Sequence, residues 1–188
     1  MTAYVALLFA VNVGGRSVPS TALRALSAEL GFAGGRTVVN SGNLVVAAGS
    51  SGATSADDVG RLVRAGVAER FGVDATVAVL ATERLAEVLE ANPFTGTARE
   101  TPARVQVLVG ERDVDADGVA RLAAEHAGPE EIAAAQGVLY VTYPDGIGRS
   151  RLTTTALARA AGTPVTGRNW NTVTRLLATA REVEAPGS

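Results

Sequence analysis

Basic and amide side chains gather in two short stretches near the C-terminal end of the chain. Gly148-Arg149-Ser150-Arg151 sets two arginines beside a serine, and Arg168-Asn169-Trp170-Asn171 holds an arginine, two asparagines and the only tryptophan. Residues 149–181 carry six Arg and no acid, whereas residues 55–148 carry 16 Asp and Glu against 8 Arg. Guanidinium groups and backbone N–H groups are the usual ligands of phosphates and carboxylates. The pattern therefore predicts a local site for an anion.

Two turns in the N-terminal half carry similar small polar groups. Asn12-Val13-Gly14-Gly15 follows an apolar run, and Ser41-Gly42-Asn43 fits a tight hairpin. Each is also explained as an ordinary turn, because Gly, Asn and Ser are the residues that turns favour. As ligand-binding residues we nevertheless predict the following nine: Asn12, Ser41, Asn43, Arg149, Ser150, Arg151, Arg168, Asn169 and Asn171.

Few side chains suit proton transfer. Tyr143 and Asp145 precede the glycine-containing loop that ends at Arg149, so they are the best catalytic candidates, although no motif identifies a reaction. His126 is the only histidine and ends an amphipathic segment rich in acids. A histidine at a helix C-terminus is stabilised by the helix dipole, so we interpret it as structural.

The absent residue types exclude several chemistries. The chain has no Cys, which excludes disulfides, thiolate nucleophiles and cysteine-bound metals. All 17 basic residues are Arg, so there is no lysine for a Schiff base or for pyridoxal phosphate. No phosphate-binding Gly-Lys-Ser/Thr motif is present, and one histidine excludes a histidine-pair metal site. We predict no metal and no cofactor.

The overall composition of the chain limits which classes of binding partner are expected. No apolar run reaches the ~18 residues of a membrane helix, and the N-terminus lacks the basic start of a signal peptide. We therefore expect a cytoplasmic protein without membrane association. With a net charge of −2 and 4% aromatic residues, nucleic acid is an unfavoured partner. A small-molecule ligand is the expected partner, and the sequence leaves the oligomeric state open.

Apolar periodicity and turn residues predict an ordered set of elements. In the N-terminal half we expect a strand at 4–11, a helix from Pro19 to Leu30, strands at 36–39 and 43–48, a helix at 55–71, a strand at 75–80 and a short helix from Thr82. In the C-terminal half we expect a strand at 103–109, a helix at 115–126, strands at 131–135 and 138–143, a helix at 151–161, an extended piece at 165–166 and a helix at 169–181.

The order of these elements predicts the fold class. Strand-helix-strand-strand-helix-strand is the split βαβ or ferredoxin-like plan, and it occurs twice. We therefore predict an α+β protein of two tandem ferredoxin-like halves packed together. The expected organisation is an N-terminal half at 1–93, a linker at 94–102, a C-terminal half at 103–183 and a flexible tail at 184–188.

Separated motifs along the chain resemble one known family. They are Tyr4-Val5-Ala6-Leu7-Leu8 with Asn12-Val13-Gly14-Gly15, Ser41-Gly42-Asn43, Asn92-Pro93-Phe94, Gly148-Arg149-Ser150-Arg151-Leu152-Thr153, and Arg168-Asn169-Trp170-Asn171-Thr172-Val173-Thr174. In this order they resemble the domain-of-unknown-function family 1697. The resemblance implies a tandem α+β fold and carries no established activity.

This chain also departs from the family pattern. Phe9-Ala10-Val11 stands where the family usually has Arg-Gly-Ile, Asn40 stands where Gln is usual, and Arg151 stands where Lys is usual. Loss of an arginine at the end of the first strand removes a charge and up to five donors. The departures indicate a divergent member with a different or less anionic ligand.

Three functions remain open at this point. The favoured one is binding of a small polar or anionic ligand in a cleft lined by Asn and Arg from both halves. The second is a divergent enzyme of specialised metabolism, of cyclase or isomerase type, working without metal or covalent catalysis. The third is a nucleic-acid-binding module, since ferredoxin-like sheets often bind RNA.

Overall fold

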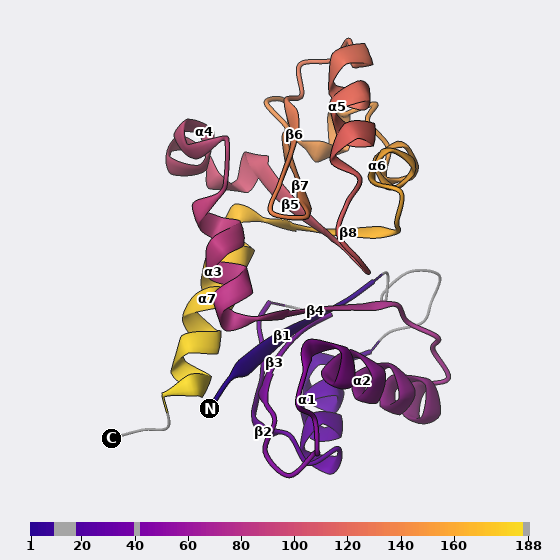
Figure 1. Ribbon diagram of the computed structural model, residues 1–188, viewed down its shortest axis with the longest axis vertical. Helices are drawn as coiled ribbons and strands as arrows, with labels where there is room; N and C mark the ends of the chain where they lie inside the picture. Colours follow the sequence, from indigo (N-terminus) through magenta and orange to yellow (C-terminus); the bar gives the residue numbers. More distant parts are fainter. Residues whose placement is uncertain (10–17, 40–41, 186–188) are drawn as a thin grey trace. The chain divides into compact units, whose positions relative to one another are not determined.

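The chain forms a mixed α+β structure with two four-stranded antiparallel sheets (Figure 1). The computed structural model describes residues 1–9, 18–39 and 42–185, and within them it contains seven α-helices. The chain divides into two compact units, Met1–Ala86 with Arg175–Ser188, and Glu87–Thr174. The α+β class predicted from the sequence is confirmed.

The first unit contains one sheet and two helices that lie on one of its faces (Figure 1). Its strands run antiparallel in the order β2-β3-β1-β4. The bounds are β1 (Ala3–Leu8), α1 (Ser20–Glu29), β2 (Ala33–Thr37), β3 (Asn43–Ala47), α2 (Ala56–Phe71) and β4 (Val77–Ala81). Helix α2 begins and ends as its sequence predicts, because Ser55 accepts a hydrogen bond from Asp58 N–H and Gly72 adopts a left-handed conformation at φ 64°.

Both faces of the central strand β1 are buried. Tyr4, Ala6 and Leu8 belong to the core that α1 and α2 cover, while the alternating residues Val5 and Leu7 are equally inaccessible. A strand buried on both faces is the structure that a continuous apolar run favours. The sheet therefore needs a cover on each side.

Helix α7 (Trp170–Glu184) supplies contacts to the first unit through its last turns. Glu184 accepts a hydrogen bond from Ala3 N–H at 2.9 Å, and Glu182 pairs with Arg36 at 2.5 Å. Val183 approaches Gly34 so closely that a Cβ there would lie 3.1 Å from a valine methyl. The end of the chain thus packs against β1 and β2, although the sequence pattern groups the whole helix with the second half.

The second unit has the same element order and the equivalent sheet. Its strands run antiparallel in the order β6-β7-β5-β8. The bounds are α3 (Thr82–Glu90), whose second half lies in this unit, α4 (Thr95–Glu100), β5 (Val105–Gly110), α5 (Ala116–Glu125), β6 (Ile132–Ala135), β7 (Val138–Thr142), α6 (Thr154–Ala161) and β8 (Val165–Asn169). Gln136 and Gly137 join β6 to β7 with positive φ angles of 47° and 63°, which suits a two-residue hairpin.

Strand β7 directs its side chains to two different layers. Leu139, Val141 and the adjoining Tyr143 belong to the core shared with α5 and α6. Tyr140 is fully buried outside that core, and its hydroxyl donates to the carbonyl of Val88 in α3 at 2.6 Å. The hydrogen bond satisfies a phenol that burial would otherwise destabilise.

The segment at 94–102, predicted to be a linker, contains regular structure. Helix α4 occupies most of it, and a 3₁₀ turn follows at Pro102–Arg104. The Asn92 side chain accepts a hydrogen bond from Phe94 N–H at 2.9 Å, and Phe94 then accepts one from Ala98 N–H. Burial of Ala98 holds this short helix, which lacks the apolar periodicity that would have predicted it.

Among the described residues, no helix is long and apolar enough to span a bilayer.

The crossing of α5 with α6 generates a prediction about stability. A Cβ at Gly118 would lie 2.2 Å from the carbonyl oxygen of Ala160, so Gly118→Ala must push the two helices apart. We expect a loss of about 1–3 kcal/mol in the free energy of unfolding, measured by urea denaturation. Gly96→Ala in α4 is the matched control: its Cβ meets nothing within 4 Å, so it should be neutral or stabilise by up to about 1 kcal/mol. Equal stabilities of the two variants would contradict the close helix crossing.

Candidate functional site

The loop after β7 carries the first predicted arginine cluster. Gly146 turns the chain with φ 88°, and a Cβ there would lie 2.7 Å from the guanidinium of Arg104. A 3₁₀ turn at Ile147–Arg149 follows. Helix α6 starts only at Thr154, where Thr153 accepts a hydrogen bond from Ala156 N–H at 3.1 Å.

The predicted helix start at residue 151 is therefore wrong by three residues. Thr153 is the better N-cap because its hydroxyl reaches the backbone of the first turn, whereas the Ser150 hydroxyl is engaged elsewhere. Arg149 and Arg151 consequently belong to a loop and not to a helix N-terminus.

A cavity of about 570 Å³ lies against this loop. Its walls come from the end of α5, the turn at 126–130, the loop at 145–152 and the first turn of α6, all within the second unit. Four of the predicted functional residues line it together: Asp145, Arg149, Ser150 and Arg151. The cavity also includes His126 and Glu130, which sequence reasoning did not place in a site.

Glu130 connects the two loops that form the cavity. One of its oxygens accepts a hydrogen bond from the Ser150 hydroxyl, and the other lies 2.7 Å from His126 Nε2. Ser150 in turn accepts from Leu152 N–H at 3.0 Å. The Glu130 side chain is only 6% exposed and that of His126 14%, so these hydrogen bonds are largely shielded from water.

These hydrogen bonds set the charge of the carboxyl group. The Ser150 hydroxyl and the His126 imidazole hold the pKa of Glu130 below its ordinary value of 4.5, against the opposing effect of burial. Glu130 is therefore an ionised carboxylate at neutral pH. It can only accept hydrogen bonds, which makes Ser150 Oγ–H and His126 Nε2–H the donors.

Gly128 allows the backbone to pass directly over the histidine–glutamate pair. A Cβ at this position would lie 2.3 Å from Glu130 Oε2 and 2.5 Å from His126 Nε2. A larger residue would have to displace one of the two side chains.

Tyr143 belongs to the apolar core and is not among the residues that line the cavity. Burial, together with the negative charge of Glu130, raises the pKa of Tyr143 to about 12. Its phenol therefore stays protonated at neutral pH and is a weak acid. Asp145 is exposed and lines the cavity, so of the two catalytic candidates it is the one open to a ligand.

The second predicted cluster serves the junction of β8 with α7. Arg168 is half-buried in β8, where its guanidinium donates to Thr166 Oγ1 at 2.8 Å and to the carbonyl of Gly167 at 2.9 Å. Burial lowers the pKa of Arg168 to about 10, which leaves it charged at neutral pH. Asn169 accepts two hydrogen bonds from Thr172, at 2.9 Å each, and so caps α7. Asn171 is exposed, and none of these predicted residues lines the cavity.

Of the three N-terminal candidates, only Asn43 falls within the described residues. Asn43 is buried at the start of β3, and its amide donates to the carbonyl of Val38 at 2.9 Å, which stabilises the connection between β2 and β3. Asn12 and Ser41 lie outside the described residues.

Sequence reasoning did not place His126 and Glu130 in the candidate site. One signal was available: the only histidine of the chain precedes a Gly-Pro turn and an acid four positions later. Helix α5 ends at Glu125, so His126 is its C-cap, as the structural interpretation requires. Its imidazole nonetheless pairs with Glu130, which that interpretation did not anticipate.

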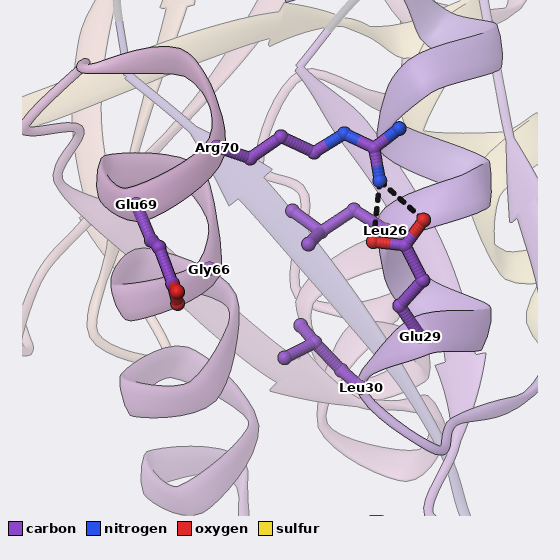
Figure 2. Close-up of a pocket in the computed structure, with 6 residues that line it drawn as sticks. All are labelled: Leu26, Glu29, Leu30, Gly66, Glu69 and Arg70. Carbon is purple, nitrogen blue, oxygen red and sulfur yellow. Dashed lines mark hydrogen bonds and ion pairs between the residues drawn. The ribbon is translucent and has the colours of Figure 1, made fainter.

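A second cavity, of about 410 Å³, lies between α1 and α2 in the first unit (Figure 2). Leu26 and Leu30 contribute its apolar surface, and Gly66 allows the two helices to approach. Arg70 and Glu29 point toward each other across it and form an ion pair. Because Arg70 and Glu29 already pair with each other, this cavity offers a ligand fewer available charged groups than the cavity beside Arg149 does.

The ionisation of Glu130 predicts a pH dependence of stability. A carboxylate with a lowered pKa stabilises the folded state fully above its unfolded value of 4.5, and that contribution is lost as the pH falls through the folded value. In urea unfolding between pH 7 and pH 3, wild type should lose this stability below about pH 4.5, while Glu130→Gln should lose less over the same range. Glu131→Gln, at an exposed neighbouring position, is the control and should follow wild type. Parallel curves for wild type and Glu130→Gln would contradict the lowered pKa.

Comparisons with known proteins agree on the fold. A family model described as Protein of unknown function (DUF1697) matches residues 1–140, which include β1 through β6 and the first three residues of β7 but not the loop at 145–152. A conserved bacterial protein from Streptococcus pneumoniae has a similar structure, with a TM-score of 0.69, 18% sequence identity, and coverage of 95% of this chain and 98% of its own. No curated protein sequence matches the chain. The chain belongs to the DUF1697 family of proteins of unknown function.

Proposed function

We propose that the protein binds a small anionic ligand in the cavity of its second unit. The observation that supports this proposal is the meeting of Arg149 and Arg151 with the hydrogen-bonded group of His126, Glu130 and Ser150 in one cavity. Ligand sites combine apolar walls with a few convergent polar groups. Leu122, Leu152 and Pro129 contribute the apolar part of this wall.

The two arginines are the groups that would hold the anion. Both are exposed, and within the described part of the chain neither guanidinium forms an ion pair or a hydrogen bond. The acid of the cavity that is shielded from water, Glu130, already accepts from Ser150 and His126. A carboxylate or phosphate can therefore take the guanidinium donors without displacing an existing partner.

The strand orders of the two units support a finer description of the fold. We propose two tandem ferredoxin-like halves, because β6-β7-β5-β8 repeats the order β2-β3-β1-β4 with the same sequence of helices. The division at 1–93, 94–102, 103–183 and 184–188 remains part of this proposal. Six further predicted residues remain candidates for ligand contacts: Asn12, Ser41, Asn43, Arg168, Asn169 and Asn171.

A second candidate function is an enzyme that moves a proton on the bound anion. It is favoured by one observation, the histidine of the cavity that is paired with an ionised carboxylate. Binding of the anion is required for either function, so it is tested first.

Calorimetric titration with inorganic phosphate and with small dicarboxylates tests the binding proposal. We expect Arg149→Ala and Arg151→Ala each to weaken the affinity by about tenfold or more, because a charge-assisted hydrogen bond contributes about 1.5–3 kcal/mol. Arg99→Ala removes the same charge from the exposed face of α4 and should leave the affinity unchanged. Equal weakening by Arg99→Ala, or no heat with any of these anions, would overturn the proposal.

A further inference from the structure

We infer that His126 is a general base, oriented by Glu130, that removes a proton from the anion bound at Arg149 and Arg151. The inference rests on the proposed function and deepens it, since it assigns the cavity a reaction class. It starts from the geometry of the histidine–glutamate pair and of the two loops that hold it.

The hydrogen bonds determine which imidazole nitrogen is basic. Glu130 is an acceptor, so His126 Nε2 carries the hydrogen that lies between them at 2.7 Å. In the neutral ring the lone pair is then on Nδ1. Within the residues that the structure describes, no hydrogen bond engages Nδ1. A neutral His126 therefore has one free acceptor, and it lines the same cavity as Arg149 and Arg151.

The carboxylate favours the product of proton transfer. When Nδ1 gains a proton, the imidazolium charge lies 2.7 Å from the ionised Glu130, and Ser150 keeps that carboxylate in place from the other side. This is how a carboxylate supports a catalytic histidine in general: it fixes the tautomer and stabilises the cation that forms. Gly128 leaves the space that the pair occupies, because a Cβ at this position would lie 2.3 Å from Glu130 Oε2 and 2.5 Å from His126 Nε2.

The other charges around His126 have defined positions. Arg149 and Arg151 of the loop after β7 line the same cavity, together with Asp145. Helix α5 contributes Glu125 immediately before the histidine, and Tyr143 at the end of β7 stays neutral. Residues Leu122 and Ala156, from α5 and α6, add no charge. The arginines are thus the cations available to a developing negative charge on the ligand.

The ligand class follows from these groups. The substrate is an anion, a carboxylate or a phosphate ester, with an acidic C–H beside a carbonyl. His126 Nδ1 takes the proton, the electrons of the C–H bond form an enolate, and a guanidinium stabilises the enolate oxygen. Return of the proton to the same or a neighbouring atom completes an isomerisation, so no oxidant, reductant or second substrate is needed.

The tautomer is testable without any ligand. His126 is the only histidine, so ¹⁵N NMR of histidine-labelled protein reports one imidazole. We expect the Nε2–H tautomer of the neutral ring in wild type and in Glu131→Gln, and a mixture of tautomers in Glu130→Gln. An Nδ1–H tautomer in wild type, or an unchanged spectrum in Glu130→Gln, would overturn the orientation by Glu130 even if phosphate binds at Arg149.

The base itself is tested with 5-nitrobenzisoxazole, a carbon acid. Removal of its C–H proton by His126 forms the nitrile and breaks the N–O bond, which releases a coloured phenolate. We expect His126→Gln to reduce the rate by about 10²-fold and imidazole in the buffer to restore part of it. Ser150→Ala, which removes the hydrogen bond to Glu130 together with the one from Leu152 N–H, should lower the rate by about tenfold. Equal rates for wild type and His126→Gln would overturn the inference. If the rates differ as expected but wild type binds no phosphate, only the anion proposal is overturned.

Discussion

Burial of both faces of the central strands is the constraint on which the rest of the structure depends. Helices α1 and α2 cover one face of β1, yet Val5 and Leu7 are buried on the other. In the second unit, Val105 and Val107 of β5 are fully buried outside the core that α5 and α6 cover. Neither central strand therefore presents a polar face to a ligand. The cavity beside Arg149 accordingly lies among loops and helix ends.

The same constraint explains the paths of α3 and α7. Each helix begins in one compact unit and ends in the other. Within the first unit, Glu184 of α7 accepts a hydrogen bond from the backbone of β1, and within the second, the Val88 carbonyl of α3 accepts one from Tyr140. Each of these two contacts lies on the face of a sheet that the two helices of the same unit leave uncovered. The hydrogen bond satisfies a polar group there and anchors α3 or α7 to the buried layer.

How much of the fold the sequence predicts depends on whether local or distant contacts decide an element. Helix α2 is predicted to within a residue because Ser55, Gly72 and an apolar stripe are all local signals. Strand β8 is predicted as a two-residue extended piece, but in the structure it continues to Asn169. Its length is determined by pairing with β5, where Val107 lies opposite Arg168 of β8. Helix α4 is held by Asn92 and by burial of Ala98, neither of which a periodic pattern reveals.

The candidate site divides in the same way. Arg149 and Arg151 can be predicted as site residues from the sequence, because two cations in a glycine-containing loop are unusual. Recognising them requires no knowledge of what they contact. Glu130 and His126 acquire their importance only from contacts across loops, since the histidine alone fits a helix C-cap and the glutamate is one acid among several. Glu130 joins the two loops and places a negative charge in the cavity. The hydrogen bond that it accepts from Ser150 holds the loop at 145–152, and the one that it accepts from His126 orients the imidazole. A replacement that kept the loops together without the charge would preserve the shape of the cavity and remove the carboxylate of the cavity that is shielded from water. The stability of the two loops and the charge of the candidate site therefore depend on the same group.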